Sequence, residues 1–124
     1  QTNQILTWSE VSEIHKSRNG IYQKQGKLIS LLTDFGQLTP YYPDWTGENE
    51  DEIFYTGAGR RGDQKLDIWN RAMLEEVNSK RTFPLFCKLK VGVWKFLGYW
   101  KIAEASYIFD EKTMRMVWKF RLKK

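Results

Sequence analysis

The chain of 124 residues has one cysteine and one histidine, and this scarcity excludes several classes of protein. Cys87 has no second cysteine with which to form an internal disulfide. One cysteine and one histidine also do not make a zinc site of the usual kind. Because Cys87 and His15 fall in unrelated segments, a Cys–His nucleophilic pair is not expected. Cys87 lies in the apolar run PLFCKLKV and is predicted to be a small core residue.

The chain also lacks a hydrophobic run long enough to span a bilayer, and it shows no signal-peptide pattern. Internal repeats and low-complexity linkers are absent from the sequence as well. Its length and its hydrophobic fraction of 41% predict one domain, residues 1–124, built around one core.

Aromatic residues and basic charge are, by contrast, abundant. Aromatics make up 15% of the chain, with six Trp, six Tyr and seven Phe. The formal net charge is +5, but residues 81–124 hold 11 Lys and Arg against 3 acids, whereas residues 1–80 hold 9 against 12. A basic C-terminal third favours a polyanionic partner, and flat side chains beside cations suit nucleobases beside phosphates. The alternative interpretation is a solvated basic face over an aromatic-rich core.

Two helices are predicted in the first two thirds of the chain. Thr7 begins T-W-S-E, a capping-box pattern that predicts a helix over residues 8–16. Asp63 is a suitable N-cap for a second helix. One face of that helix would carry Leu66, Trp69, Asn70, Met73, Leu74 and Val77.

Strands are predicted around these helices and dominate the last third. Residues 20–25 and 27–33 suggest a hairpin that turns at Gln25-Gly26, and residues 53–56 form a short apolar strand. In MRMVWKFRLKK, apolar residues from Met114 to Leu122 alternate with a nearly all-basic set, which predicts a half-buried strand with a basic outer face. Gly92 stands where a tight reversal is needed. Many short strands with two helices predict a curved or barrel-like α+β domain.

The stretch FYTGAGRRGDQK, residues 54–65, contains the pattern G-x-G-x-x-G at Gly57, Gly59 and Gly62. A dinucleotide site would need a continuously buried parallel strand after the helix, ending in an acid that binds ribose. FPLFCKLKV instead alternates with lysines, so we reject that interpretation. Glycines also let a backbone pass close to a ligand, and a loop entering a helix N-terminus favours a phosphate. Arg60 and Arg61 add two cations at the same place.

A second enzymatic interpretation rests on carboxylates. Pro43-Asp44 and Asp63-Gln64-Lys65 match the loose PD…(D/E)xK pattern of metal-dependent nucleases. The two acids would hold Mg²⁺ and Lys65 would orient water. The long polar loop over residues 36–52 carries the acid-rich tract ENEDE, and loops of this length are often functional. In that nuclease family the second half of the pattern lies on a strand, whereas Asp63 is predicted to cap a helix.

Four short motifs stand in the order in which a known family carries them. Members of the SRA (SET and RING-associated) domain family carry Tyr-x-x-Asp, then Y-[ST]-G-x-G, then D-Q-x-L followed by N-x-A-[LM]. This chain has them at residues 41–44, 55–59, 63–66 and 70–73, and its closing VWKFRLKK is similar to the family's last strand. Over about residues 18–124 the chain resembles an SRA domain. It is most similar to the short bacterial form that heads modification-dependent HNH restriction endonucleases.

The resemblance implies a crescent-shaped, PUA-like β-barrel with two flanking helices that reads modified DNA bases. Such domains flip 5-methylcytosine or 5-hydroxymethylcytosine out of the duplex into a pocket. Tyr41 and Tyr55 match the two stacking aromatics, and Asp44 and Thr56 match the residues at the pairing edge of the base. These types suit the chemistry, because a flipped base needs π faces and polar partners. The expected contacts to the DNA backbone, or to the gap left by the base, are Gly57, Gly59, Arg60 and Arg61.

The chain departs from the family pattern in two places. Eukaryotic members insert a finger between the glycine loop and D-Q-x-L and fill the gap with it, whereas only residues 60–62 stand there in this chain. Either the two arginines fill the gap, or another loop does, or base flipping is handled differently. The loop from Tyr41 to Tyr55 also differs in length from the family's, so Tyr42 or Trp45 could take the place of Tyr41.

The sequence therefore predicts a DNA-binding module and not an enzyme, with neither metal nor cofactor. Its predicted partners are double-stranded DNA with a modified base and a nuclease domain in the parent protein, with no membrane. A cytoplasmic bacterial location is expected. The alternatives are a reader of unmodified DNA in a restriction enzyme, and a small Mg²⁺-dependent nuclease that uses Asp44, Asp63 and Lys65.

Overall fold

A computed structural model describes residues 2–38 and 42–124 of the chain, which is mostly β-sheet with two short helices. The helices are α1 (Trp8–Val11) and α2 (Ile68–Leu74). The strands are β1 (Ile5–Leu6), β2 (Ile21–Lys24), β3 (Lys27–Thr33), β4 (Trp45–Thr46), β5 (Glu52–Thr56), β6 (Phe83–Lys90), β7 (Val93–Asp110) and β8 (Arg115–Lys123).

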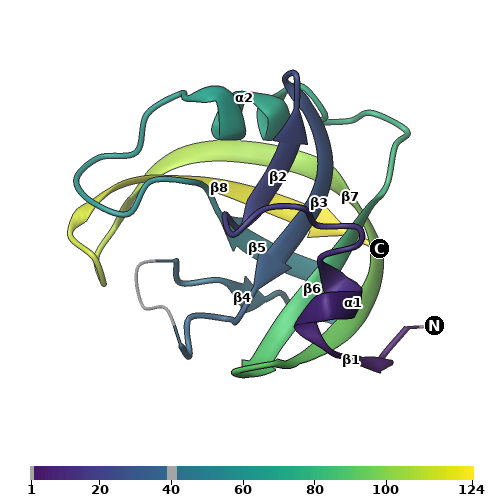
Figure 1. Cartoon of the computed structure of the whole chain (residues 1–124). Helices are drawn as coiled ribbons and strands as arrows, with labels where there is room; N and C mark the ends of the chain where they lie inside the picture. Colours follow the sequence, from purple (N-terminus) through teal and green to yellow (C-terminus); the bar gives the residue numbers. More distant parts are fainter. Residues whose placement is uncertain (1, 39–41) are drawn as a thin grey trace.

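The strands form one curved sheet in the order β2-β3-β6-β7-β8-β5-β4, with β1 paired to β7 (Figure 1). Of the named strand pairs, β3 and β6 run parallel and the others antiparallel. The predicted α+β, PUA-like curved β-architecture is confirmed, but the sheet does not close: β2 and β4 remain its two ends. The parallel strands β3 and β6 are separated by about fifty residues of sequence. Parallel strands need a long connection, and here it contains β4, β5 and α2.

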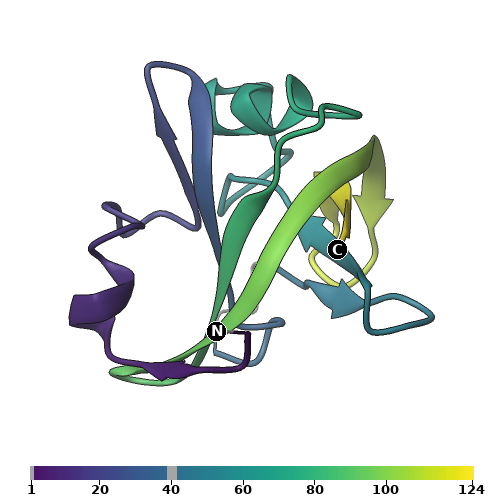
Figure 2. The ribbon, with the colours of Figure 1, turned by 90° about the vertical axis from the view of Figure 1, so that its right-hand side faces the viewer.

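Strand β7 connects the two halves of the sheet. Its first part pairs with β1 and β6, and its second part pairs with β8 over Lys101–Asp110. A register shift at Ile102–Glu104 and a positive φ of +90° at Gly98 lie near the point where its partner changes. Such irregularities increase strand bending. Figure 2 shows β2 and β3 on one side of the molecule and β5 and β8 on the other, with β6 and β7 between them.

The main core fills the inside of this curve. Phe83, Leu85, Met73, Phe120 and Leu122 are at most 1% exposed and belong to one cluster of buried apolar side chains. Burying each such side chain contributes roughly 1.5–3 kcal/mol. Cys87 is also buried, as predicted, and burial raises the pKa of its thiol to about 11.

Two tight turns lie at the glycine positions that the sequence indicated. Gln25 and Gly26 have φ of +55° and +83°, which is the geometry of a type I′ hairpin turn between β2 and β3. Gly92, with φ of +77°, reverses the chain between β6 and β7. Both predicted reversals are confirmed.

The first helix is shorter than predicted. Its capping box is present, because Thr7 Oγ1 accepts from the Glu10 N–H at 3.2 Å and Glu10 Oε1 accepts from the Thr7 N–H at 2.9 Å. The helix nevertheless ends at Val11 and does not continue over residues 8–16. The chain leaves the helical path to bury His15, whose Nε2–H donates to the Asn19 carbonyl at 2.6 Å and whose Nδ1 accepts from Ser30 Oγ at 2.7 Å.

The second helix begins later than predicted. Asp67 is its N-cap, since Asp67 Oδ1 accepts from the Asn70 N–H at 2.8 Å. Asp63 does not cap it: Asp63 Oδ1 accepts instead from the Met116 N–H at 2.8 Å. Leu66 precedes the helix and is 42% exposed, so the predicted apolar face is wrong at that end. Tertiary pairing with β8 therefore takes precedence over the local capping pattern.

The prediction for β8 is half right. Phe120 and Leu122 are fully buried, as the alternation indicated. The opposite face is not a solvated basic surface, because Arg115 and Lys119 are each only 5% exposed. Loops cover this second face and offer carbonyl oxygens: Arg115 Nη1 donates to the Gly59 and Gly62 carbonyls at 2.5 Å and 3.2 Å.

Candidate nucleic-acid interface

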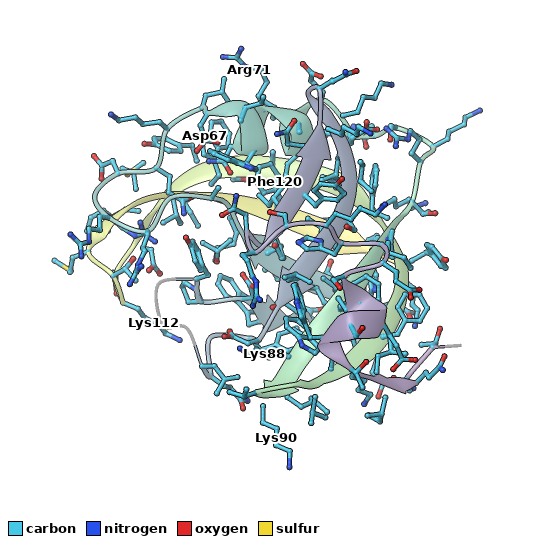
Figure 3. The ribbon with its side chains drawn as sticks, viewed as in Figure 1. Asp67, Arg71, Lys88, Lys90, Lys112 and Phe120 are labelled. Carbon is cyan, nitrogen blue, oxygen red and sulfur yellow. The ribbon has the colours of Figure 1, made fainter. Side chains whose placement is uncertain are left out.

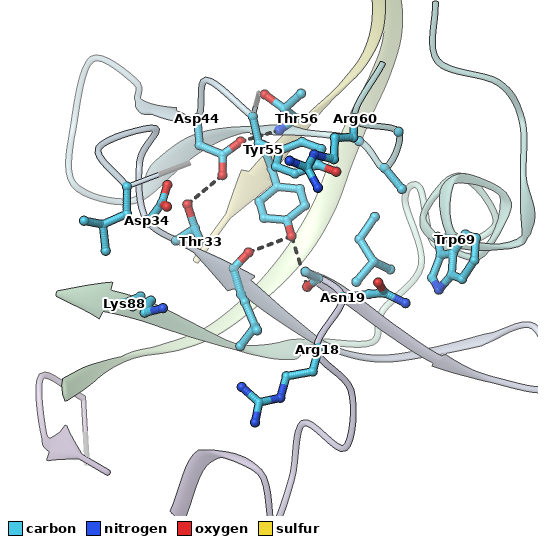
Figure 4. Close-up of a pocket in the computed structure, with 18 of the residues that line it drawn as sticks. Arg18, Asn19, Thr33, Asp34, Asp44, Tyr55, Thr56, Arg60, Trp69 and Lys88 are labelled. Atoms are coloured by element: carbon cyan, nitrogen blue, oxygen red, sulfur yellow. Dashed lines mark hydrogen bonds between the residues drawn. The ribbon is translucent and has the colours of Figure 1, made fainter. Parts of the chain in front are cut away.

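A cavity of about 880 Å³ opens beside the end of β3, the end of β5 and the turn between β6 and β7. Figure 4 shows it in close-up. Six of the predicted site residues line it: Asp44, Tyr55, Thr56, Gly57, Gly59 and Arg60. Arg61 is not among the lining residues, and Tyr41 lies outside the described residues. Segments far apart in the sequence are thus brought together at one place.

Asp44 supplies a buried carboxyl group to this cavity. Thr33 Oγ1 donates to Asp44 Oδ2 at 2.6 Å, and the Thr56 N–H donates to Asp44 Oδ1 at 2.6 Å (Figure 4). Burial raises the pKa of Asp44 to about 6, although these hydrogen bonds and the charge of Lys119 act in the opposite direction. Near neutral pH the group is therefore mainly a carboxylate, which accepts hydrogen bonds and does not donate them.

Lys119 lies directly across from Thr56 in the β5–β8 register. Its Nζ donates to Thr56 Oγ1 at 2.5 Å and to the Pro43 carbonyl at 3.1 Å, and it lies 4.1 Å from the centroid of the Trp45 ring. Burial lowers the pKa of Lys119 to about 8, against the attraction of Asp44. Sequence reasoning missed this residue, because strict alternation along β8 assigned it to the solvent face.

Tyr55 is 3% exposed, belongs to the main core and lines the cavity. Its hydroxyl donates to the Leu32 carbonyl at 2.7 Å and lies 3.1 Å from the Gly20 carbonyl (Figure 4). Burial raises its pKa well above the ordinary value. Phe54, on the other side of β5, stacks on Trp45 with ring centroids 5.4 Å apart. Both faces of β5 are therefore occupied, and Trp45 does not line the cavity whereas Tyr42 does.

The glycine loop after β5 is held by two buried amide side chains. Gln64 Nε2 donates to the Gly57 carbonyl at 2.6 Å, and Gln64 Oε1 accepts from the Trp118 N–H at 2.8 Å. Asn70 Oδ1 accepts from the Ala58 N–H at 2.7 Å, and Asn70 Nδ2 donates to the Ala58 carbonyl at 2.9 Å. The D-Q-x-L and N-x-A-[LM] residues thus fix the loop. Contrary to the expectation from the sequence, the loop does not lead directly into the N-terminus of α2, because Asp67 caps that helix. That the loop contacts phosphate stays a prediction.

Gly57 is required by close packing and not by its backbone angle. A Cβ at this position would lie 2.5 Å from Asn70 Oδ1 and 2.8 Å from Trp118 Cβ. We expect Gly57→Ala to lower the free energy of unfolding by about 1–3 kcal/mol, as overpacking does. Urea denaturation measures the effect. Gly62→Asn is the matched control, because a Cβ there meets nothing within 4 Å and Asn tolerates the φ of +65°. Equal stability of Gly57→Ala and wild type would contradict the steric role.

The two enzymatic interpretations do not match the arrangement of strands and acids. β5 pairs with β4 and β8, while β6 pairs in parallel with β3, so the strand–loop–helix–strand segment is not the βαβ unit of a dinucleotide fold. Asp63 and Lys65 do not line the cavity that holds Asp44. Within residues 2–38 and 42–124, no cluster of three or more His, Cys, Asp or Glu side chains is placed to hold a metal ion.

Positive charge lies around the cavity, but less of it comes from the C-terminal third than the sequence indicated. Arg18, Arg60 and Lys88 line the cavity. In Figure 3, Lys88 and Lys90 lie on the side of the molecule opposite Arg71. Arg121, by contrast, is engaged in ion pairs with Glu52 and Glu104 at 3.1 Å and 2.8 Å. Some basic residues of the C-terminal third therefore form contacts within the domain.

The open curved sheet thus carries a cavity that is lined by a buried Asp, a Tyr and a glycine loop held by two amide side chains. The chain belongs to the family described as the ScoMcrA-like SRA domain, whose sequence profile matches residues 12–124. The resemblance noted from the four motifs is thereby confirmed. No curated protein sequence matches the chain. The described helices include none that is long and apolar enough to cross a membrane.

Several solved structures share the fold. The SRA domain of SUVH5 in complex with hemimethylated CG DNA has a TM-score of 0.81 at 22% identity, covering 100% of this chain and 87% of that one. The modification-dependent TagI restriction endonuclease has a TM-score of 0.79 at 18% identity, covering 100% of this chain and 49% of that one. The SUVH5 SRA domain bound to fully hydroxymethylated CG DNA has a TM-score of 0.77 at 21% identity, covering 100% and 88%.

Proposed function

We propose that this domain binds duplex DNA that carries 5-methylcytosine or 5-hydroxymethylcytosine and takes the modified base into the cavity beside Asp44 and Tyr55. The proposal also places the domain in a cytoplasmic bacterial restriction system, in which a nuclease domain of the parent protein cuts the DNA. Two similarities support it: the structural neighbours include complexes with methylated and hydroxymethylated DNA, and TagI is a modification-dependent restriction endonuclease of which this chain spans about half.

The observation that carries the proposal is the hydrogen bonding of Asp44. A carboxylate offers about four acceptor positions. Thr33 Oγ1 and the Thr56 N–H occupy two of them. About two positions remain for a guest in the cavity. The guest must therefore bring a hydrogen-bond donor to Asp44.

The exocyclic amine of cytosine is such a donor. Thymine carries a methyl group at the same ring position as 5-methylcytosine, but it presents the O4 acceptor where cytosine presents its N4 amine. Two acceptors facing each other in a buried site are unfavourable, because neither finds a proton. An ionised Asp44 consequently selects a methylated cytosine over a thymine.

The energies of base flipping fit a cavity of this kind. Unstacking a base costs a few kcal/mol, and stacking on one aromatic side chain returns about 1–3 kcal/mol. Tyr55 supplies one ring, and the cations Arg18, Arg60 and Lys88 can meet the phosphates on either side of the flipped nucleotide. Tyr42, which lines the same cavity, is a candidate for the opposite wall in addition to Tyr41.

The test is a comparison of matched duplexes that carry one cytosine, 5-methylcytosine or 5-hydroxymethylcytosine at the same position. We expect tighter binding to the modified duplexes in fluorescence anisotropy, and a fluorescent base analogue at that position should report unstacking in the complex. Adding Mg²⁺ should leave all three duplexes uncut by the isolated domain. Equal affinity for the three duplexes would support a reader of unmodified DNA instead, and cleavage would support a nuclease.

A further inference from the structure

Lys119 touches the residues on both sides of Asp44 in the sequence. Its Nζ donates to the carbonyl of Pro43 and lies over the ring of Trp45, at 3.1 Å and 4.1 Å respectively. A third contact, to Thr56 Oγ1 at 2.5 Å, reaches the residue that donates to Asp44. One side chain from β8 thereby fixes the loop that carries the carboxyl group and the strand that binds it.

We propose that Lys119 is a positioning residue for base recognition, which holds Asp44 in the cavity, keeps its carboxylate ionised and so sets the preference for modified cytosine over thymine. This inference rests on the proposed function. Lys119 does not line the cavity, so it acts on the base through Thr56 and Asp44 and not by contact.

The direction of the hydrogen bonds carries this argument. An ammonium group donates three hydrogen bonds and accepts none, so Thr56 Oγ1 must be the acceptor in its contact with Lys119. The backbone N–H of the same residue, Thr56, donates to Asp44 Oδ1 at 2.6 Å, so a series of contacts leads from Lys119 through Thr56 to the carboxylate. Removing the ammonium group of Lys119 removes its hydrogen bond to Thr56 and a positive charge near Asp44.

The buried charge is not needed to fill space. Lys119 is 5% exposed, and a methionine side chain has a similar length, so Lys119→Met keeps most of the packing. The variant loses the ammonium group and its hydrogen bonds to Pro43 and Thr56. Removing one of two buried opposite charges can destabilise the fold, so the role of Lys119 is measured by the pH dependence of binding in the folded variant.

The other titratable and charged groups near Asp44 are the same in wild type and in Lys119→Met. Asp34 at the end of β3, Tyr55 on β5, Lys88 on β6 and Arg18 and Arg60 on loops line the same cavity. His15 does not interfere, because burial lowers its pKa to about 4. Asp44, whose pKa is about 6, changes its charge between about pH 5 and pH 7.

The sign of the pH dependence follows from the carboxylate. Ionised Asp44 accepts from the cytosine amine, so selectivity is present above the pKa of about 6 and is lost as the pH falls through it. The charge of Lys119 lowers the pKa of Asp44. Without that charge the pKa of Asp44 rises, and selectivity is lost at a higher pH.

The experiment measures the affinity ratio for two duplexes, one with 5-methylcytosine opposite guanine and one with thymine opposite guanine, as a function of pH. A mismatched thymine leaves the stack more readily than a paired 5-methylcytosine, so the ratio contains a difference in flipping cost. That difference belongs to the DNA and cancels when wild type and variant are compared at the same pH. We expect the midpoint of the ratio to move up by about one pH unit in Lys119→Met. At a pH below both midpoints, the affinity ratio of Lys119→Met should be about tenfold lower than that of wild type. Lys119→Arg should keep the wild-type midpoint.

Lys123→Met is the matched control, because Lys123 lies on the same strand and is exposed. It should leave the midpoint unchanged. An unchanged midpoint in a folded Lys119→Met variant would overturn the role of Lys119 while leaving the proposed function intact. A wild-type protein with no preference for the methylated duplex at any pH would instead overturn the proposed function. Should Lys119→Met fail to fold, Thr56→Val removes the hydroxyl group that Lys119 contacts, and we expect its midpoint to shift in the same direction. An unchanged midpoint in Thr56→Val would overturn the inference.

Discussion

Tyr55→Leu is expected to lose most of the preference for DNA with a modified cytosine, while Tyr55→Phe keeps it. The ring of Tyr55 lines the cavity, and stacking on a base is worth about 1–3 kcal/mol, or roughly fivefold to more than a hundredfold in affinity. Leucine fills much of the buried space but offers no π face. Phenylalanine retains the ring and loses the hydroxyl contacts to the Leu32 and Gly20 carbonyls, at a cost of about 1–3 kcal/mol in stability.

Leucine is the sharper replacement because Tyr55 is also a core residue. Truncating a large buried aromatic side chain to alanine costs about 3–5 kcal/mol, so Tyr55→Ala would confuse unfolding with loss of binding. Anisotropy and the fluorescent base analogue measure the binding, and thermal unfolding verifies the fold. Tyr99→Leu, a change at a 56% exposed tyrosine outside the cavity, is the control. A folded Tyr55→Leu variant with wild-type selectivity would show that Tyr55 serves the core alone.

Asp44→Asn is expected to reduce the preference for 5-methylcytosine over thymine at least about tenfold, since one matched base contact discriminates by about 1–3 kcal/mol. The amide has one acceptor oxygen and one donor nitrogen, so it cannot accept from Thr33, from Thr56 and from a base at the same time. Its nitrogen can also donate to thymine O4. The pH dependence of the ratio should disappear together with the titrating group.

Asp34→Asn provides a control with the same loss of charge in the same cavity. Asp34 Oδ1 accepts from the Gly36 N–H at 2.8 Å, a local turn contact that an amide oxygen can preserve. This variant should bind all duplexes somewhat more tightly, because a negative charge near phosphate is removed, and it should keep the selectivity. If Asp34→Asn and Asp44→Asn change the affinity ratio equally, the effect is one of charge and Asp44 does not read the base.

The features of this fold that local patterns determine were predictable from the sequence. The capping box at Thr7, the turn at Gln25-Gly26 and the reversal at Gly92 each depend on a few neighbouring residues. The family also was predictable, because four motifs in order carry it. Asp44 and Tyr55 were found by the same motifs, and the structure places both at one cavity.

The features that depend on distant segments were not predictable in this way. Asp63 has the sequence context of a helix cap, yet it bonds to the backbone of Met116, 53 residues further along. Lys119 has the context of a solvated strand residue, yet Pro43, Trp45 and Thr56 cover it. Alternation along a strand predicts both faces correctly only when one of them meets water, and here the second face of β8 meets another part of the chain.

The order in which this chain can fold follows from the parallel pairing of β3 with β6. That pairing joins Leu31 to Leu85, and the pairing of β5 with β8 joins Thr56 to Lys119. Neither can form before a long loop has closed, and sheets of such non-local pairs fold slowly. The cavity takes walls from residues 18–21, 32–34, 55–60 and 88–94, so a partly folded chain has no cavity. The proposed recognition of a modified base therefore depends on the completed sheet, and we expect no contiguous fragment of the domain to show it.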